Sequence, residues 1–597
     1  MVKNKLQMLQ VLVLMIAVMA GSMTEAPAQK KGKSKEKVAS NTAPVFSQFS
    51  YKGSDRIYNE NPLKPDEFYT PILQGCYPDP SMVRRGNDYF LVNSSFSMFP
   101  GVPIFHSADL VNWKQIGHVL DRPSQLKVEK SGISAGIYAP CIKYNKINET
   151  FYMITTQIAG GVGNMVVKTK DPFKGWGEVI KLKFDGIDPS MFFDDDGKAY
   201  VVHNDAPDKG KELYNGHRVI KIWEYDLQND QVIPGSDKII VDGGVDITQK
   251  PIWIEGPHIY KKAGKYYLMC AEGGTGGWHS EVIFMSDSPK GPFVPAPNNP
   301  ILTQRHFPAD RKNKIDWTGH ADLVEGKDGK YYAVFLGIRP NAKDRVNAGR
   351  ETFLLPVDWS GTYPVFENGL VPMKPVLKMP KGVTNQTGQN GYFPNGNFTF
   401  TDNFTAAQLD YRWIAMRGPR DSFATKVAGG GIRIKPFDAN IKAQAPVAAL
   451  FHRQQHSSFE AGVNMQYIPT SEKDLAGITC YQGESFSYVF GVTKKENEYY
   501  LVLAKTARER QPGPPRQGAA AKTEIVASVK VDLKKALRLQ VSASQQDEYS
   551  FSYSSDGATF LNLGGIVSGD ILSTNVAGGF TGSLIGLYAT TGNDIQP

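Results

Sequence analysis

The sequence predicts an all-β protein that consists of a five-bladed β-propeller followed by a β-sandwich. Three observations predict this class: a local pattern that recurs five times, a composition rich in turn-forming and aromatic residues, and the absence of sustained helical periodicity beyond residue 30. Aromatic residues make up 11% of the chain, and 58 Gly and 38 Pro favour short strands joined by tight turns. At 597 residues the chain is too long for one core and should divide into domains.

Residues 1–28 are predicted to be a secretory signal peptide. Lys3 and Lys5 precede an apolar run at 6–20, and small residues follow it. This order is typical of export, and the run is short for a membrane span. We therefore expect an exported protein, periplasmic or secreted, with no membrane association once the leader is removed. Residues 29–64, which begin with several lysines, are predicted to be a basic spacer and linker.

The positive charge of the chain belongs mostly to this N-terminal part. Residues 1–40 contain seven Lys and two Glu, a net charge of +5 out of the formal +8, so the remainder is near +3. This small charge gives little support to nucleic-acid binding. The four cysteines are far apart and form no CxxC motif, which argues against a disulfide scaffold and a zinc site. We expect them to be mostly buried and free, with a Cys76–Cys141 pairing left open.

The recurring pattern is a turn, then an aromatic pair, then a β-rich run. The second residue of the pair serves as a marker, and successive markers are 62, 48, 67 and 65 residues apart: Phe90, Tyr152, Tyr200, Tyr267 and Tyr332. Each copy can be read as four strands, and five such units predict a propeller over residues 65–375. The innermost strands of a propeller surround one axis, so residues at their common ends converge on one pocket.

Four copies bring a candidate functional side chain to nearly the same offset from the marker. Asp79 lies 11 residues before its marker, and Asp188, Glu255 and His320 each lie 12 before theirs. In the second copy residues 138–140 fill this position, without an acid. Surface turns have no reason to share this offset, so we predict that the three acids converge. For His320, a hydrogen-bonded core histidine is the alternative.

Converging carboxyl groups predict acid–base catalysis, most typically glycoside hydrolysis. An inverting hydrolase needs one ionised carboxylate that holds a water and one protonated carboxyl that reaches the leaving oxygen, roughly 6.5–9.5 Å apart. Carboxylates crowded near one axis raise each other's pKa, which helps to keep the acid protonated near neutral pH. We find no nucleotide, haem or redox motif in the sequence. The predicted chemistry therefore requires only water.

The repeat pattern stops at about residue 376. Residues 376–400 are predicted to be a loop-rich linker between two domains. Residues 401–597 contain strand-like stretches such as YYLVLAKT and LRLQVSAS, without the blade pattern. Strands of ordinary length without that repeat indicate a β-sandwich.

Several long stretches around the candidate residues are similar to a known family. They are CYPDPS, DYFLVNSSFSMFPGVPIFHSADLVNWKQIG, IDPSMFFDDDGKAYVV, IEGPHIYKKAGKYYLMCAEGGTG, GHADLVEGKDGKYYAVFLGIRP and GRETFLLPVDW. Together they resemble glycoside hydrolase family 43 in its β-xylosidase-like branch. Residues from about 400 onward resemble the concanavalin A-like sandwich, a jelly roll, that accompanies β-xylosidases of this family.

The resemblance implies a catalytic role for each acid. Asp79 matches the general base that activates water, and Glu255 matches the general acid that protonates the leaving group. Asp188 matches a third acid that modulates the pKa of Glu255 and holds its orientation. No cofactor is implied for the reaction itself.

The resemblance also implies substrate contacts. Arg350 matches an arginine that binds sugar hydroxyls, and Phe96 matches an aromatic wall beside the sugar. Tyr138 stands where relatives commonly have Trp, so the stacking surface there is smaller or offers a hydroxyl. His320 matches a histidine at the pocket floor, which in some relatives is associated with Ca²⁺, so the resemblance leaves a Ca²⁺ ion near His320 open.

The leading interpretation is an exo-acting, inverting β-xylosidase that releases xylose from the non-reducing ends of xylooligosaccharides. The alternative is an α-L-arabinofuranosidase on arabinoxylan or arabinan side chains, or a bifunctional enzyme. A remote alternative is a non-catalytic sugar-binding propeller, but a binding site does not need a matched acid and base. The expected partner is an oligosaccharide or polysaccharide derived from xylan or arabinoxylan.

Overall fold

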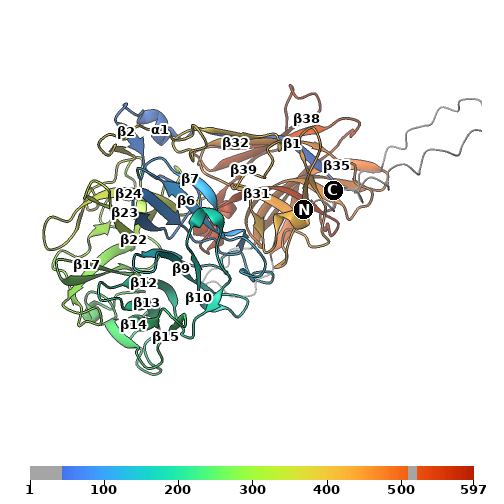
Figure 1. Cartoon of the computed structure of the whole chain (residues 1–597). Coiled ribbons are helices and arrows are strands. Elements are labelled where there is room, and N and C mark those ends of the chain that lie inside the picture. The colour runs from blue at the N-terminus through green and yellow to red at the C-terminus, as the bar shows by residue number, and fades with distance from the viewer. Residues whose placement is uncertain (1–42, 509–520) are drawn as a thin grey trace, which may run out of the picture. The chain divides into compact units, whose positions relative to one another are not determined.

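The computed structural model describes residues 43–508 and 521–597, so the predicted signal peptide at 1–28 lies outside the described residues. Antiparallel sheets build a propeller and a sandwich, which confirms the predicted fold class (Figure 1). Within the described residues, helices are few and short: α1 (Arg56–Glu60) and α2 (Thr574–Ala577), with 3-10 turns η1 (Pro172–Lys174), η2 (Ile247–Gln249), η3 (Arg420–Ser422) and η4 (Asp570–Leu572). In the part of the chain that the structure describes, no helix has the length and apolar character of a membrane span.

Five sheets form the blades of the propeller. Blade 1 contains β3 (Ser81–Arg85), β4 (Asp88–Val92), β6 (Gly101–Ser107) and β7 (Lys114–Leu120). Blade 2 contains β8 (Cys141–Asn145), β9 (Thr150–Gln157), β10 (Gly163–Thr169) and β11 (Ile180–Lys181). Blade 3, whose first strands lie side by side in Figure 1, contains β12 (Ile187–Phe193), β13 (Ala199–Asp205), β14 (Val219–Asp226), β15 (Gln231–Val232) and β16 (Lys238–Asp242).

The last two blades follow the same order. Blade 4 contains β17 (Glu255–Lys262), β18 (Lys265–Glu272), β19 (Ser280–Ser286), β20 (Val294–Pro295) and β21 (Leu302–Thr303). Blade 5 contains β22 (Asp316–Glu325), β23 (Tyr331–Ile338), β24 (Glu351–Asp358) and β25 (Val365–Phe366). The pair β2 (Glu67–Tyr69) and β26 (Val376–Lys378) joins the two ends of the propeller segment.

Apolar side chains buried between neighbouring blades close the ring. Phe90 of blade 1 and Phe151 of blade 2 meet edge to face with ring centroids 5.2 Å apart. Leu91 of blade 1 lies in one buried cluster with Val334 of blade 5, which joins the first blade to the last. Equivalent clusters fill the other three junctions. Burial of apolar surface on both faces of each sheet is the main term that holds the ring together.

Two further sheets form the sandwich. The larger one contains β1 (Val45–Gly53), β27 (Thr399–Asp402), β29 (Ala424–Lys426), β30 (Ile432–Ile434), β32 (Phe459–Gln466), β37 (Leu537–Ala543), β38 (Glu548–Ser554) and β39 (Leu561–Ser568). The smaller one contains β31 (Ala449–Arg453), β33 (Leu475–Gly483), β34 (Phe486–Lys495), β35 (Glu498–Ala507), β36 (Lys522–Lys530) and β40 (Leu584–Thr590). The core between the sheets is apolar, with Val463 and Leu539 from one sheet and Ile478 and Phe490 from the other. A short pair, β5 (Met98–Phe99) and β28 (Ala415–Met416), joins propeller and sandwich sequences.

The N-terminal segment differs from the prediction of a spacer and linker at 29–64. Residues Val45–Gly53 form strand β1, which pairs with β27, β30 and β32 in the larger sandwich sheet. Phe46, Phe49 and Tyr51 are buried in the sandwich core. The lysine-rich start of the segment dominated the prediction, and the register of β1 shifts between Ser47 and Ser50, so a simple alternation is lost.

The predicted linker at 376–400 also contains pieces of sheet. It begins with β26, and its last residues belong to β27; turns lie between them. The four cysteines all fall within the described residues and are buried and free, so Cys76 and Cys141 are not paired.

Candidate active site

The strand register defines five equivalent positions at the inner end of the blades. The same ladder position recurs in every blade: Ser81–Val92, Cys141–Ile154, Ser190–Val202, His258–Met269 and Asp322–Val334. The first residues of these pairs form what we call the channel layer. Two residues earlier in each blade lies what we call the site layer: Asp79, Ala139, Asp188, Gly256 and His320. Glu255 therefore lies one residue before the site-layer position of blade 4. Its offset from the marker had instead placed it at that position.

Backbone conformation turns the site layer toward the axis. The φ angle is 51° at Asp79, 53° at Asp188, 56° at Gly256 and 55° at His320, which is the left-handed region that non-glycine residues rarely adopt. The strand register shifts at the same places in blades 3, 4 and 5, and such bulges redirect side chains at functional sites. Only glycine fits at 256, because a Cβ atom there would lie 2.7 Å from Nε2 of His320.

Asp79 is buried and surrounded by hydrogen-bond donors. Its Oδ1 accepts a hydrogen bond from Arg350 Nη1 at 3.0 Å, and its Oδ2 accepts one from Ser94 Oγ at 2.6 Å. His320 Nδ1 lies 3.9 Å from Oδ1. Burial by itself raises the pKa of Asp79, but the Arg350 charge, His320 and the Ser94 hydrogen bond outweigh it, so the pKa lies below its usual value. Asp79 is therefore ionised at neutral pH.

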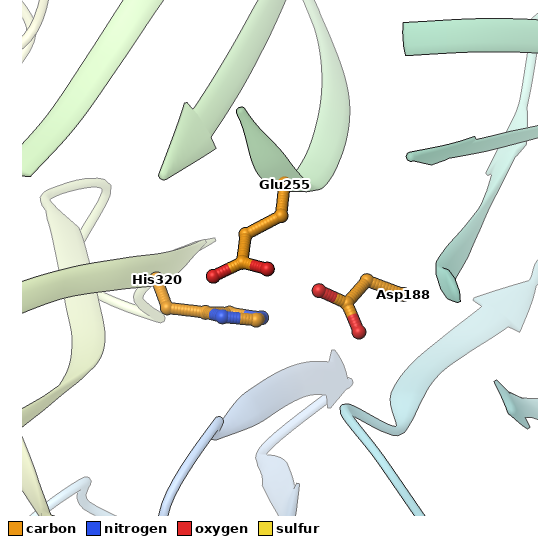
Figure 2. Close-up of side chains that lie close together, drawn as sticks. All are labelled: Asp188, Glu255 and His320. Carbon is orange, nitrogen blue, oxygen red and sulfur yellow. The ribbon is translucent and has the colours of Figure 1, made fainter. Parts of the chain in front are cut away.

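Glu255 is buried like Asp79, but its carboxyl group is protonated and not ionised. Burial raises the pKa of Glu255 well above its usual value, and the charges of Asp188 and Asp79 raise it further. Burial likewise raises the pKa of Asp188 to about 6, with His320 opposing. Figure 2 shows the carboxyl groups of Glu255 and Asp188 directed toward each other beside the His320 ring. The site therefore combines a protonated carboxyl with an ionised one.

Aromatic side chains form the walls of the pocket, whose volume is about 390 Å³. Phe96 and Phe580 are stacked with ring centroids 6.2 Å apart and an interplanar angle of 18°. Tyr138 meets both rings edge on, at 6.0 Å from Phe96 and 5.7 Å from Phe580. Burial and the Asp188 charge raise the pKa of Tyr138 to about 12, so its hydroxyl stays protonated.

Arg350 links the pocket to the sandwich segment that follows β39. Besides Asp79, its Nη1 donates to Thr275 Oγ1 at 2.9 Å, and its Nη2 donates to the Phe580 carbonyl at 3.5 Å. Its guanidinium carbon lies 5.6 Å from the centroid of the Phe580 ring. Arg350 is therefore held from both sides, with its charge against Asp79.

The pocket contains every residue that the sequence analysis singled out: Asp79, Phe96, Tyr138, Asp188, Glu255, His320 and Arg350. It also contains residues that the sequence analysis missed: Ile252, Trp253, Thr275 and Phe580. The glycine-rich loop around Thr275 carried a usable signal, since such loops allow close approach to a ligand. No local pattern around Phe580 indicates a role, because it belongs to the other domain.

The atoms of Asp188, Glu255 and His320 that could ligate a metal lie within 4.8 Å of one another. This is the place beside His320 where the family resemblance leaves a Ca²⁺ ion as an open question. This set fits Ca²⁺ poorly, because Ca²⁺ takes roughly six to eight oxygen ligands and one of these three donors is an imidazole nitrogen. A cation there would also ionise Glu255, whose pKa burial raises. We therefore derive no step through a metal ion.

Family models match both domains of the chain. The model for glycosyl hydrolases family 43 matches residues 68–363, and the model for the beta xylosidase C-terminal concanavalin A-like domain matches residues 401–596. The chain is 34% identical to the xylosidase/arabinosidase of Butyrivibrio fibrisolvens, over 87% of this chain and 95% of that protein. It is 32% identical to a non-reducing end alpha-L-arabinofuranosidase of Bacteroides ovatus, over 88% of this chain and 92% of that protein.

Solved structures agree over both domains. A crystal structure described as a GH43_12 retrieved from capybara gut metagenome is 58% identical, with a TM-score of 0.87 over 92% of this chain and all of that chain. A xylan beta-1,4-xylosidase from Bacillus halodurans is 28% identical, with a TM-score of 0.75 over 88% of this chain and 97% of that chain. The protein is a glycosidase of the xylosidase/arabinosidase type that acts on a carbohydrate. With its buried carboxyl groups on a five-bladed propeller and this likeness over both domains, the chain belongs to family 43 of the glycosyl hydrolases.

Proposed function

We propose that the protein is an inverting, exo-acting glycosidase that releases a terminal pentose from a glycan chain. The observation that carries this proposal is the opposite protonation of two carboxyl groups in one pocket. The pKa of Asp79 is lowered by Arg350, and the pKa of Glu255 is raised by burial. An ionised base and a protonated acid are what single-displacement hydrolysis needs.

In the proposed reaction, Asp79 takes a proton from a water molecule as its oxygen attacks the anomeric carbon. Glu255 donates its proton to the glycosidic oxygen as the bond to the anomeric carbon breaks, so the leaving sugar departs as an alcohol. The negative charge of Asp188 keeps the pKa of Glu255 high and so keeps the acid loaded. Asp79 ends protonated and Glu255 ionised, and exchange with solvent restores both.

Exo action is supported by the closed wall of the pocket. Phe96, Tyr138 and Phe580 meet ring to ring on one side, so a chain has no room to continue through that wall. A pocket of about 390 Å³ suits a single terminal sugar and its hydrating water. The expected export of the protein fits a substrate that is an extracellular or periplasmic glycan.

Two pentoses are candidates for the released sugar. The leading candidate is β-D-xylose from the non-reducing end of xylooligosaccharides, as the name of the Bacillus halodurans relative suggests. The second candidate is α-L-arabinofuranose from arabinoxylan or arabinan side chains. It is favoured by the names of two relatives above 30% identity, a xylosidase/arabinosidase and an arabinofuranosidase.

The test is hydrolysis of nitrophenyl β-D-xyloside and nitrophenyl α-L-arabinofuranoside by the purified protein, with Asp79→Ala as the blank. Turnover that disappears in the variant supports the enzyme and its base, and the ratio of the two rates identifies the sugar. Proton NMR of the first product formed distinguishes inversion from retention. If both glycosides bind without turnover, and if Glu255→Ala binds them equally well, the protein is a sugar-binding module and the proposal fails.

A further inference from the structure

Trp253 is an aromatic side chain beside the proposed acid that the catalytic scheme leaves unused. It precedes Glu255 by two residues, lines the pocket and is 36% exposed. Its φ angle of 59° lies in the left-handed region, which is strained for an aromatic residue. Its backbone N–H donates to the carbonyl of Gly216 at 3.0 Å, which holds the strained residue in place. Strain of this kind is often found at binding and catalytic sites.

Arg218 supports one face of the Trp253 ring. The guanidinium carbon lies 4.7 Å from the ring centroid, and both Nε and Nη2 donate to Asn204 Oδ1, at 3.1 and 2.7 Å. Asn204 in turn donates to the carbonyl of Ile254 at 2.5 Å. One face of the ring is therefore held by contacts within blade 3 and with Ile254, which lies just before the first strand of blade 4. Its remaining surface is open to solvent and to the pocket.

The exposed surface of Trp253 lies on the side of Glu255 where we expect the leaving sugar to bind. Glu255 delivers its proton to the glycosidic oxygen, so the sugar on the other side of that oxygen lies next to Glu255 and outside the closed pocket. Trp253 and Ile252, which is 54% exposed, are the apolar residues beside Glu255 that reach solvent. The apolar face of a pyranose ring packs well on an aromatic ring, which offers a large, rigid surface.

The apolar rim continues onto the next loop of blade 4. Gly273 donates its N–H to the carbonyl of Ile252 at 2.8 Å, and this loop places Thr275 in the pocket wall. The same loop carries Trp278, whose side chain is 73% exposed. Arg305 donates to the carbonyl of Trp278 at 3.2 Å and anchors it. An aromatic side chain this exposed, beside the pocket entrance, suits a ligand that extends beyond the pocket.

We propose that Trp253, supported by Arg218, binds the first sugar of the leaving group, and that Trp278 contacts a sugar further along the same chain. The ligand class is a neutral oligosaccharide or polysaccharide chain built of pyranoses. This inference rests on the proposed function and deepens it. The protein would then cleave chain ends, and its affinity for a substrate would depend on chain length through contacts on the blade 4 side of the pocket.

The test compares a substrate that fills this surface with one that does not. A pentosyl fluoride of the sugar that the wild type releases has fluoride as its leaving group, and an oligosaccharide of three or more residues covers both tryptophans. Trp253→Ala should lower the ratio of kcat/KM on the oligosaccharide to kcat/KM on the fluoride by about tenfold, since it removes the rigid aromatic surface on which the first sugar of the leaving group packs. Trp278→Ala should lower the same ratio by about threefold, and only for chains of three or more sugars.

Phe173→Ala is the matched control. Phe173 is an exposed aromatic residue in η1, at the far end of blade 2 from the pocket, and its loss should leave the ratio unchanged. A Trp253→Ala protein that hydrolyses both substrates with an unchanged ratio overturns the inference. A wild-type protein that hydrolyses neither substrate overturns the proposed function itself, so the two failures are distinct.

Trp253→Phe keeps an aromatic ring, and it controls for the possibility that Trp253→Ala misfolds the loop. Burial raises the pKa of Glu255, and the hydrogen bond from the Trp253 indole opposes this by favouring the ionised form. Without that donor the pKa of Glu255 rises, so the alkaline limb of the kcat/KM profile should move to higher pH. Most of the oligosaccharide-to-fluoride ratio should remain. A lost ratio with an unmoved alkaline limb would overturn the role of the ring as a sugar platform.

Discussion

The same five blades build the pocket and the channel layer, yet Glu255 in the pocket and Asp322 in the channel layer have opposite electrostatic environments. In the channel layer, Asp322 accepts hydrogen bonds from Ser81 Oγ and Tyr260 OH, both at 2.7 Å, and from Lys143 Nζ at 2.8 Å. Burial would raise its pKa, but His258, Lys143 and these hydrogen bonds lower it strongly. In the pocket, beside the site layer, Glu255 forms no ion pair with a described residue, and its pKa is raised.

The difference shows what separates a structural carboxylate from a carboxyl group that can donate a proton on a single scaffold. A buried charge with a full set of donors is locked in one protonation state and holds neighbouring strands together. A buried carboxyl without such donors keeps a proton that it can transfer. The two carboxyl groups come from the first strands of neighbouring blades, β17 and β22. The comparison leads to four predictions.

Glu255→Gln should have the largest effect on activity and the smallest on stability. Loss of the proposed general acid should lower kcat/KM on an oligosaccharide by about 10³-fold or more. Because the carboxyl is protonated and lacks a cationic partner, the free energy of unfolding should stay within about 0.5 kcal/mol of wild type or rise. Kinetics and urea unfolding measure the two quantities. A loss of activity below tenfold would contradict the assignment of the acid.

Asp322→Asn should show the reverse pattern. Removing its charge leaves Lys143 buried without a counter-charge, which should lower the free energy of unfolding by about 3 kcal/mol. The activity of the molecules that stay folded should change only a few-fold. Urea unfolding measures the loss, with Asp195→Asn as control, since Asp195 pairs with Lys261 at a side chain that is 86% exposed. Equal stability of the two variants would contradict the structural role of Asp322 in the channel layer.

Asp188→Asn should shift the pH dependence of the reaction. The charge of Asp188 adds to burial in raising the pKa of Glu255, so its loss lowers that pKa. Glu255 then loses its proton at lower pH, and the alkaline limb of the kcat/KM profile should move down. The acid limb follows ionisation of Asp79, whose pKa is lowered, and should move little. The rate at the optimum should fall by on the order of tenfold to a hundredfold. An alkaline limb that stays in place or moves up would contradict this electrostatic role.

Phe580→Ala should have the smallest effect of the four. It removes one aromatic wall of the pocket while leaving the acid and base in place. We expect KM to rise about tenfold, in line with the loss of one buried aromatic contact, with a smaller change in kcat. Phe560→Ala, an exposed position of the sandwich, is the control. An unchanged KM would separate the sandwich from substrate binding.

The sequence predicted the fold class and the convergence of the acids because both follow from a repeat that is visible in one dimension. Asp79 and Asp188 stand before the same Pro-Ser pair, and the marker offset was enough to place them near one axis. It could not separate Glu255 from the site layer, because that needs the ladder register and the left-handed backbone at Gly256.

Other parts of the site have no local signal at all. Phe580 reaches the pocket from a different domain, and only the packing of propeller and sandwich sequences brings it to Arg350. The roles of Trp253 and Trp278 depend on exposure, which a sequence pattern does not give. Contacts between distant segments are the part of a fold that periodicity and turn chemistry do not encode.

Strand β1 has a consequence for the order in which the protein is built. Its partners β27 and β32 lie roughly 350 to 420 residues later in the chain, so β1 leaves the ribosome long before it can pair. The five blades have local contacts and can close while β1 waits with Phe46, Phe49 and Tyr51 uncovered. Until then β1 is an unpaired apolar strand, the kind of segment that chaperones bind and that aggregates when exposed. Assembly of the sandwich, and with it the closing of the pocket by Phe580, is thus the late step of biogenesis.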